Sequence, residues 1–223
     1  MNQPVATLEA PTSSRRYGGA SAEERQAQRR ERLMAAAFDV FGREGYLQST
    51  MRLINAQARL TERYFYESFA TLDEAFMAVH KRLSAEVSQR IVLQIAAQPD
   101  DPVAQTRAGL RAFFEFIKED PRRAQILLTD AVITGLASPC NLNARVSYYR
   151  DLLKERFKKR YPNLSIELDL DLIVGGFVGM IIHTSSVWVK RGFDVPVETM
   201  VDHNAYAWVG MHQWLSKANV CHV

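Results

Sequence analysis

Apolar residues recur every three or four positions along most of the chain, and this spacing predicts an all-α protein. The first helix is expected from Ser21 to Glu44, with Ser21 and Glu24 as a capping box and Gly45 just past its end. Residues 1–20 are rich in Pro, Ser, Gly and Ala, which predicts a disordered tail. No segment has the pattern of a strand, so about nine helices are expected.

Residues 50–69 are expected to form two short helices joined by a tight turn. Thr50 is a good N-cap for the first helix, because its hydroxyl can accept a hydrogen bond from a free backbone N–H. Thr61 would cap the second helix, in which Phe65 and Phe69 fall on one face. Two helices that cross at a short turn, the second carrying Arg and Tyr, are typical of a helix-turn-helix that enters the major groove.

Residues around this turn occur at the spacing of a known family. They are Leu33, Met34, Ala36, Ala37, Val40, Phe41, Gly45, Tyr46, Thr50, Met51, Arg52, Ile54, Ala58, Leu60, Thr61, Phe65, Tyr66, Phe69, Asp73 and Glu74. The stretch 33–76 therefore resembles the N-terminal domain of the tetracycline-repressor (TetR) family. The resemblance implies a DNA-binding head at 21–69 and an effector-binding and dimerisation body at 70–223.

Three positions depart from the family pattern. Asn55 occupies a position where the family prefers a small Ala, and Arg59 one where it prefers Gly. A left-handed turn costs a non-Gly residue about 1 kcal/mol. Leu72 replaces a Lys that usually touches DNA phosphate in the family. These departures affect the expected contacts with DNA more than the expected fold.

The residues expected to contact a double-stranded operator lie on the two short helices. They are Thr50, Arg52, Thr61, Glu62, Arg63, Tyr64 and Tyr66. Arg63 can fork onto a guanine edge, while the tyrosines can stack or donate to phosphates. The alternative role of the two threonines is capping alone.

Charge supports this interpretation only weakly, because the formal net charge is +3. Every basic residue before Lys81 is Arg, which suits forked contacts to phosphate or guanine, although codon bias is an alternative. The arginines in and just after the tail could form an arm that reaches DNA, or could simply keep it solvated. They are Arg15, Arg16, Arg25, Arg29 and Arg30.

The body begins with a long helix, expected from Leu72 to about Ala97 after a capping box formed by Thr71 and Glu74. It would join the head to the body and is the natural lever for a switch. The remaining helices are expected at 102–118, 121–133, 141–161, 168–189 and 195–215, with a break at 135–139.

The last two helices are expected to form the interface of a homodimer. The helix 168–189 is apolar nearly all round and is expected to be buried on most sides. In the family the last two helices pack against their twofold mates. A helix-turn-helix also needs a dimer, because its half-sites lie about 34–36 Å apart. The expected interface residues are Gly175, Gly179, Val201, Trp208 and Met211, with a plain intrachain core as the alternative.

Apolar walls with a few polar groups predict a small-molecule pocket in the body. Its candidate residues are Phe113, Phe116, Tyr148, Phe177, Met180, His183 and Thr184, each of which could instead belong to the core. Basic residues are scarce along 102–118 and 168–189. A mainly apolar or aromatic effector is therefore favoured over a polyanion.

Catalytic motifs are lacking, so an enzyme is not expected, nor a cofactor or metal. Asp169 and Asp171 lie on different helix faces, and His203 and His212 are wrongly spaced for a shared metal. Two cysteines, no apolar N-terminal run and a longest apolar stretch of only 172–182 favour a cytoplasmic protein that does not enter a membrane.

The sequence therefore predicts a homodimeric, ligand-responsive transcription factor, most simply a repressor released from its operator by a small apolar molecule. A ligand would bind one of two arrangements of the long helix better and so change the separation of the recognition helices. An activator and a protein-responsive regulator are alternatives of the same class. A helical interaction module whose head binds DNA weakly or not at all is the alternative from another class.

Overall fold

The computed structural model describes residues 21–129, 151, 154–161 and 169–220, and within these ranges every regular element is helical. This confirms the all-α prediction. The elements are α1 (Ala22–Glu44), η1 (Tyr46–Gln48), α2 (Met51–Ala58), α3 (Glu62–Tyr66), α4 (Leu72–Ala96), α5 (Pro102–Glu119), α6 (Pro121–Ala124), η2 (Gln125–Thr129), α9 (Leu170–Lys190) and α10 (Val197–Val220). Residues 154–160 are also helical. The tail 1–20, the break 135–139, Cys140, Tyr148 and Cys221 lie outside the described residues.

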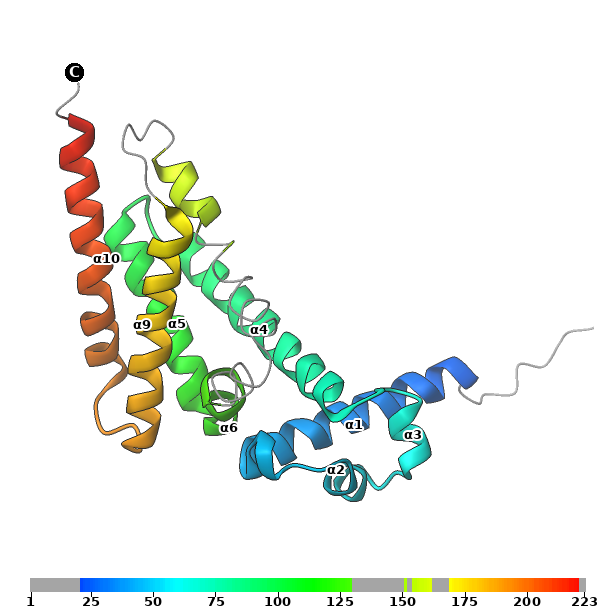
Figure 1. The fold of residues 1–223 in the computed structure, drawn as a ribbon. Helices are drawn as coiled ribbons and strands as arrows, with labels where there is room; N and C mark the ends of the chain where they lie inside the picture. The colour runs from blue at the N-terminus through cyan, green and yellow to red at the C-terminus, as the bar shows by residue number, and fades with distance from the viewer. Residues whose placement is uncertain (1–20, 130–150, 152–153, 162–168, 221–223) are drawn as a thin grey trace, which may run out of the picture.

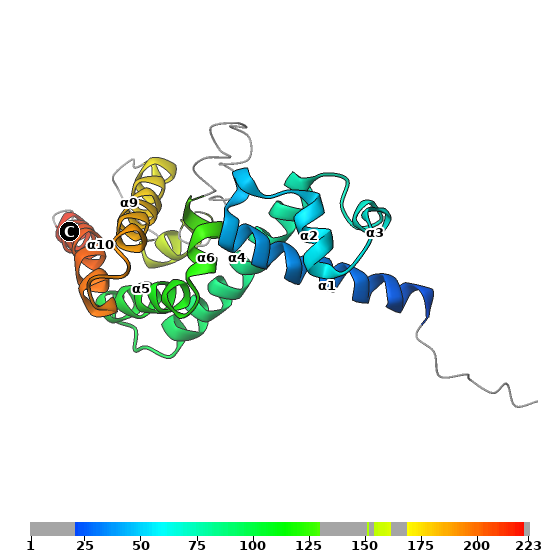
Figure 2. The same cartoon turned by 90° about the horizontal axis from the view of Figure 1, so that it is seen from below.

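Helices α1, α2 and α3 form a head at one end of the molecule, and α4 runs from this head into the body (Figure 1). Helix α5 packs along α4, while α9 and α10 lie side by side at the far edge of the body. The view from below shows the same separation of the head from the α9–α10 pair (Figure 2). The elements that could read DNA are therefore remote from those expected to form a dimer.

Most helix starts follow the sequence signals. Ser21 Oγ accepts from the N–H of Glu24 at 3.0 Å, and the Glu24 carboxylate accepts from the N–H of Ser21 at 2.6 Å, which completes the capping box. Asp101 and Asp120 each cap a helix that has proline in its first turn. These bonds join residues that are close in sequence, so the helix starts can be recognised without tertiary contacts.

Two caps differ from the expectation. Thr61 occupies the N-cap position of α3, but its hydroxyl makes no cap hydrogen bond. Thr71 accepts from the N–H of Glu74 at 3.1 Å, yet the Glu74 carboxylate accepts from the N–H of Ala70 at 2.6 Å instead of closing on Thr71. The second capping box is therefore displaced by one residue.

The helix expected over 121–133 is also interrupted. Helix α6 ends at Ala124, and residues 125–129 continue as the π-helical turn η2. Ile126 and Leu128 of this turn are buried in the core. A π-helical turn of this kind often lies at a functional site.

One hydrophobic core runs from the head into the body. Phe41 of α1 meets Phe76 of α4 edge to face, with ring centroids 5.0 Å apart. Farther along, Phe114 of α5 meets Trp188 of α9 in the same manner at 5.8 Å. Because α4 contributes to both halves of this core, a movement of α4 would reach both the head and the body.

Helix α9 is less buried than its composition predicts. It is long and apolar enough to cross a membrane by length and composition alone, with a mean hydropathy of 1.7 over its most apolar window. Only 22% of that window is buried within the chain, so the expectation of burial on most sides is wrong for the single chain. The uninterrupted apolar run 172–182 is shorter than the helix, which extends from Leu170 to Lys190 and includes polar residues that the hydropathy average tolerates.

Candidate nucleic-acid interface

In the head, α2 and α3 are joined by a tight turn and both pack on α1, as in a helix-turn-helix. Ile54 and Ala58 of α2 and Phe65 of α3 are buried in the core that α1 shares. Residue Arg59 makes the turn in the left-handed conformation, with φ 52° and ψ 48°. Burial of one face of each short helix leaves the other face turned outward.

The outward face of α3 carries the predicted contact residues. The Arg63 side chain is 84% exposed, and Tyr66 is 56% exposed. Arg52 on α2 and Glu62 on α3 are also exposed. The α3 surface therefore presents one cationic and one phenolic group, which suit a guanine edge and a phosphate.

The Tyr64 side chain is less exposed than expected, since it is half-buried. The guanidinium of Arg29, on α1, lies over its ring at 4.6 Å. Arg29 also reaches the Glu67 carboxylate at 3.7 Å, and the same carboxylate accepts from Arg63 Nε at 3.1 Å. Tyr64 thus contributes to packing of α3 on α1, and its contact with DNA stays a prediction.

Arginines of α1 bind the helix-turn-helix and help to hold it in place. Neither a solvated tail nor an arm that reaches DNA predicts these contacts. Arg30 donates to the Ser68 carbonyl at 3.2 Å and lies over the ring of Phe69 at 4.4 Å. Arg32 donates to the carbonyl of Ala58 at 2.7 Å. Helical spacing alone could not show these contacts, because the partners are far away in the sequence.

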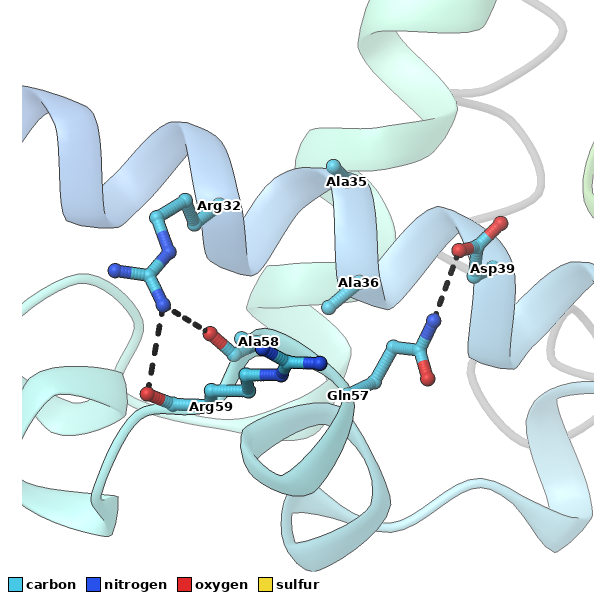
Figure 3. Close-up of a pocket in the computed structure, with 7 residues that line it drawn as sticks. All are labelled: Arg32, Ala35, Ala36, Asp39, Gln57, Ala58 and Arg59. Carbon is cyan, nitrogen blue, oxygen red and sulfur yellow. Dashed lines mark hydrogen bonds between the residues drawn. The ribbon is translucent and has the colours of Figure 1, made fainter.

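An open hollow of about 290 Å³ lies between α1 and α2. It is lined by Arg32, Ala35, Ala36, Asp39, Gln57, Ala58 and Arg59. Figure 3 shows two hydrogen-bonded links across it, from Arg32 to the end of α2 and from Gln57 to Asp39. Because the alanine side chains are small, polar contacts join α1 and α2 in this part of their junction.

The threonines have separate roles. Thr50 Oγ1 accepts from the N–H of Leu53 at 3.2 Å, so Thr50 does cap α2. Thr61 makes no such bond and is exposed, which leaves its hydroxyl available to an external group. The free N–H groups at the start of a helix favour an anion such as phosphate.

The structure shows the environment of each of the three departures from the family pattern. Asn55 is 5% exposed, and within the described ranges neither its side-chain oxygen nor its nitrogen has a hydrogen-bond partner. Arg59 has the left-handed backbone that the family gives to glycine. Leu72 is partly buried against the core and so presents no cation to DNA.

The predicted effector residues are spread over several packing environments. Phe116 is fully buried, with the guanidinium groups of Arg90 and Arg123 over its ring at 5.0 and 4.2 Å. Phe113 is partly buried beside Phe114. Their contact with an effector stays a prediction.

The effector residues on α9 behave differently from one another. Phe177 stacks on Trp208 of α10 with ring centroids 4.1 Å apart, and Met180 is half-buried. Thr184 Oγ1 donates to Asn204 Oδ1 at 2.9 Å, so it links α9 to α10. His183, expected on a buried face, is exposed instead.

The predicted dimer residues divide into two groups. Among the residues that the structure describes, none lies within 4 Å of a Cβ added at Gly175 or Gly179, and Met211 is only half-buried. Val201 is 0% exposed and Trp208 is buried against Phe177. Val201 and Trp208 are therefore packed within the protomer, and their contact with a second chain stays a prediction.

Comparison with known proteins shows distant similarity over most of the chain. No protein-family model matches it. The HTH-type transcriptional activator FasR of Mycolicibacterium smegmatis is 22% identical over 190 residues, covering 82% of this chain and 83% of FasR.

Solved structures agree more closely in shape than in sequence. A TetR-like transcriptional regulator from Rhodococcus sp. RHA1 superposes with a TM-score of 0.61 and 23% identity, covering 83% of this chain and 97% of that one. The transcriptional regulator FadR from Bacillus subtilis, solved in complex with stearoyl-CoA, gives a TM-score of 0.63 at 15% identity, over 79% of this chain and 95% of that one. The chain therefore has the fold of the TetR-family transcriptional regulators.

Proposed function

We propose that this protein is a dimeric transcriptional regulator that binds an operator through α3 and is controlled by a small molecule with a long apolar part. The observation that carries the proposal is the outward display of Arg63 and Tyr66 on a helix whose other face is buried. Similarity to transcriptional regulators over most of the chain supports it. The same similarity favours a regulator over an enzyme.

The proposed DNA contacts are divided by function. Arg63 reads a base edge, and Tyr66 with the free N-terminus of α3 at Thr61 engages phosphates. Arg52, exposed on α2, supplies a further phosphate contact. A chain that recognises DNA in this manner loses affinity as salt rises, because each phosphate contact releases counterions.

The proposed effector is a long-chain acyl compound, bound mainly through its hydrocarbon chain. FadR of Bacillus subtilis was solved with stearoyl-CoA, which contains such a chain. Two arginines of α5 are already paired with carboxylates of α10, Arg107 with Asp202 at 2.6 Å and Arg111 with Glu198 at 2.6 Å. A polyanionic head group would have to compete for these cations, so burial of the acyl chain must supply most of the affinity.

The free energy from such burial is adequate for a micromolar-range sensor only if little of it is lost to ordering, so the pocket has to be largely preformed. Burial of roughly 300 Å² of apolar ligand surface at about 25 cal/mol per Å² gives about 7–8 kcal/mol before the cost of association. The body can respond through α4, because α4 packs in both the head and the body. A ligand that binds one arrangement of α4 better would change the operator affinity by at most its differential binding energy.

Dimerisation is proposed through the open face of α9 and the adjoining part of α10. Gly175 and Gly179 leave room for a helix of a second copy, and Leu172, Tyr206 and Trp214 are exposed apolar groups on the same two helices. A partner chain explains this surface better than a membrane does. Helix α10, which packs against α9, carries Glu198 in an ion pair with Arg111 of α5, and such charged groups are costly to bring into a bilayer.

We propose repression as the direction of control, in a cytoplasmic protein. A bound dimer can block a promoter without any further contact, whereas activation needs a surface for the transcription machinery. The similarity to FasR, a transcriptional activator, makes activation the second candidate. In vitro transcription from the operator-bearing promoter separates the two, because added protein lowers the transcript in one case and raises it in the other.

One titration tests the proposal as a whole. The protein is bound to a labelled fragment of its own upstream DNA, and stearoyl-CoA, stearate and CoA are added separately. Release by stearoyl-CoA or stearate, together with a change in the fluorescence of the buried Trp188, supports an acyl effector. Release by CoA alone would contradict it. Failure of the protein to bind any upstream fragment at low salt would favour an interaction module.

A further inference from the structure

The two carboxylate oxygens of Asp39, on α1, serve two different parts of the molecule. Oδ1 is paired with Arg122 Nη1 of α6, in the body. Oδ2 accepts a hydrogen bond from Gln57 Nε2 of α2, in the helix-turn-helix, at 3.1 Å (Figure 3). A single side chain thus joins the body to the DNA-binding head.

The Arg122 side chain makes two further contacts besides its pair with Asp39. Its Nη2 and Nε donate to the Asp120 carboxylate at 2.7 and 2.9 Å. Its guanidinium also lies over the ring of Phe38 at 4.7 Å. Because Asp120 caps α6, the position of Arg122 follows the position of the start of that helix.

Helices α1 and α6 are in close contact at this point, so one helix cannot shift without moving the other. A Cβ added at Gly42 would lie 2.5 Å from Arg122 Cβ, where no side chain fits. The turn η2 follows α6 directly and packs against α1, α4 and α9. Because α1 and α6 are tightly packed here, a displacement of η2 or α6 would also displace Asp39.

The head side of the link depends on few other contacts. Gln57 lies at the rim of the hollow between α1 and α2, where Ala35, Ala36 and Ala58 provide little side-chain volume. The other polar links there run from Arg32 to the carbonyls of Ala58 and Arg59. Asp39 and Arg32 thus add polar contacts to the apolar packing of Ile54 and Ala58 that holds α2 on α1.

We infer that Asp39 is a positioning residue that couples the α6–η2 segment of the body to the orientation of the helix-turn-helix. Arg122 and Gln57 act on each other through the shared carboxylate, since they bind different oxygens of it. Loss of Arg122 frees Asp39 to turn and weakens its bond to Gln57. The consequence for operator affinity rests on the proposed function, whereas the mechanical link does not.

The test is hydrogen exchange of α2 together with a double-mutant cycle. Arg122→Gln should make the amides of α2 exchange about two- to tenfold faster. The matched control is Arg111→Gln, which removes a similarly exposed arginine from an ion pair between α5 and α10 and should leave α2 unchanged. Gln57→Ala, at an exposed position, should have the same effect on α2 without loss of the fold.

The double variant should be less than additive, because either change alone already breaks the link through Asp39. In an Asp39→Ala background, Arg122→Gln should have no further effect on α2. Strict additivity, or α2 exchange that is unchanged in folded Arg122→Gln protein, would overturn the inference. Operator binding by the unaltered protein is measured separately. Its failure would contradict the proposed function, while the exchange result would still decide whether Asp39 couples α6 to α2.

Discussion

Arg63 Nε lies 3.1 Å from Oε1 of Glu67, one helical turn farther along the chain. The proposed base-reading arginine is therefore already paired in the protein without DNA. Glu67 also attracts Arg29 of α1 at 3.7 Å, so one carboxylate restrains two cations of the DNA-facing side. The pair is exposed enough that water and salt screen it, and DNA can compete for both arginines.

Replacement of this carboxylate should tighten DNA binding. Glu67→Gln removes a negative charge from the DNA-facing surface and releases Arg63 and Arg29, so affinity for any duplex should rise about two- to tenfold at low salt. Fluorescence anisotropy at two salt concentrations measures this. A control variant, Glu155→Gln, removes an exposed carboxylate of the body and should have little effect. Weaker binding by Glu67→Gln would mean that Glu67 orients Arg63 for DNA instead of restraining it.

Replacement of Asn55 should stabilise the head. Its amide is buried without a hydrogen-bond partner, and an unpaired buried amide costs about 1–3 kcal/mol. Asn55→Ala should therefore raise the free energy of unfolding by about 1 kcal/mol, after the loss of some packing. Denaturant unfolding followed by circular dichroism gives the value. A clear loss of stability would show that the packing of the side chain outweighs its unpaired polar atoms.

Replacement of Arg59 tests the left-handed turn. Glycine adopts φ 52° without strain, so Arg59→Gly should raise the free energy of unfolding by up to about 1 kcal/mol, less the greater entropy of glycine in the unfolded chain. Arg59→Ala keeps a Cβ and should gain nothing, which makes it the matched control. Equal effects of the two changes would assign the result to the arginine side chain and not to the backbone.

A bulky group at Gly179 should separate folding from assembly. Because a Cβ there meets no atom within 4 Å in the described part of the chain, Gly179→Leu should leave the protomer folded, while it should clash with a helix of a second copy. Analytical ultracentrifugation should then show monomers for Gly179→Leu and dimers for the control Ala85→Leu on the exposed side of α4. A stable dimer of the Gly179 variant would place the interface elsewhere.

The sequence predicted the helices well wherever a local signal specifies them. Ser21 with Glu24, Thr50, and the Asp-Pro pairs at 101 and 120 cap helices with bonds to residues two or three positions away. Such bonds are visible in the pattern because both partners are near in sequence. The same holds for the apolar face of α2 and α3 that forms the helix-turn-helix.

Contacts between distant segments could not be predicted in this way. The link from Arg122 to Asp39 and the position of Arg29 over Tyr64 depend on how helices meet in three dimensions. The burial of Val201 within the protomer could not be predicted for a related reason, because an apolar stripe on a helix does not show whether the surface that covers it belongs to the same chain. The π-helical turn at 125–129 has no local sequence signal that we can identify.

The central claim, that α3 reads DNA through Arg63, is tested most directly by selection from a random duplex library. The unaltered protein should enrich an inverted repeat with half-sites about one helical turn apart, or a multiple of it. Arg63→Ala should bind the selected site about 1–3 kcal/mol more weakly and lose preference at one position of each half-site. Enrichment of no sequence at low salt, or of the same sequence by Arg63→Ala with unchanged affinity, would contradict the account.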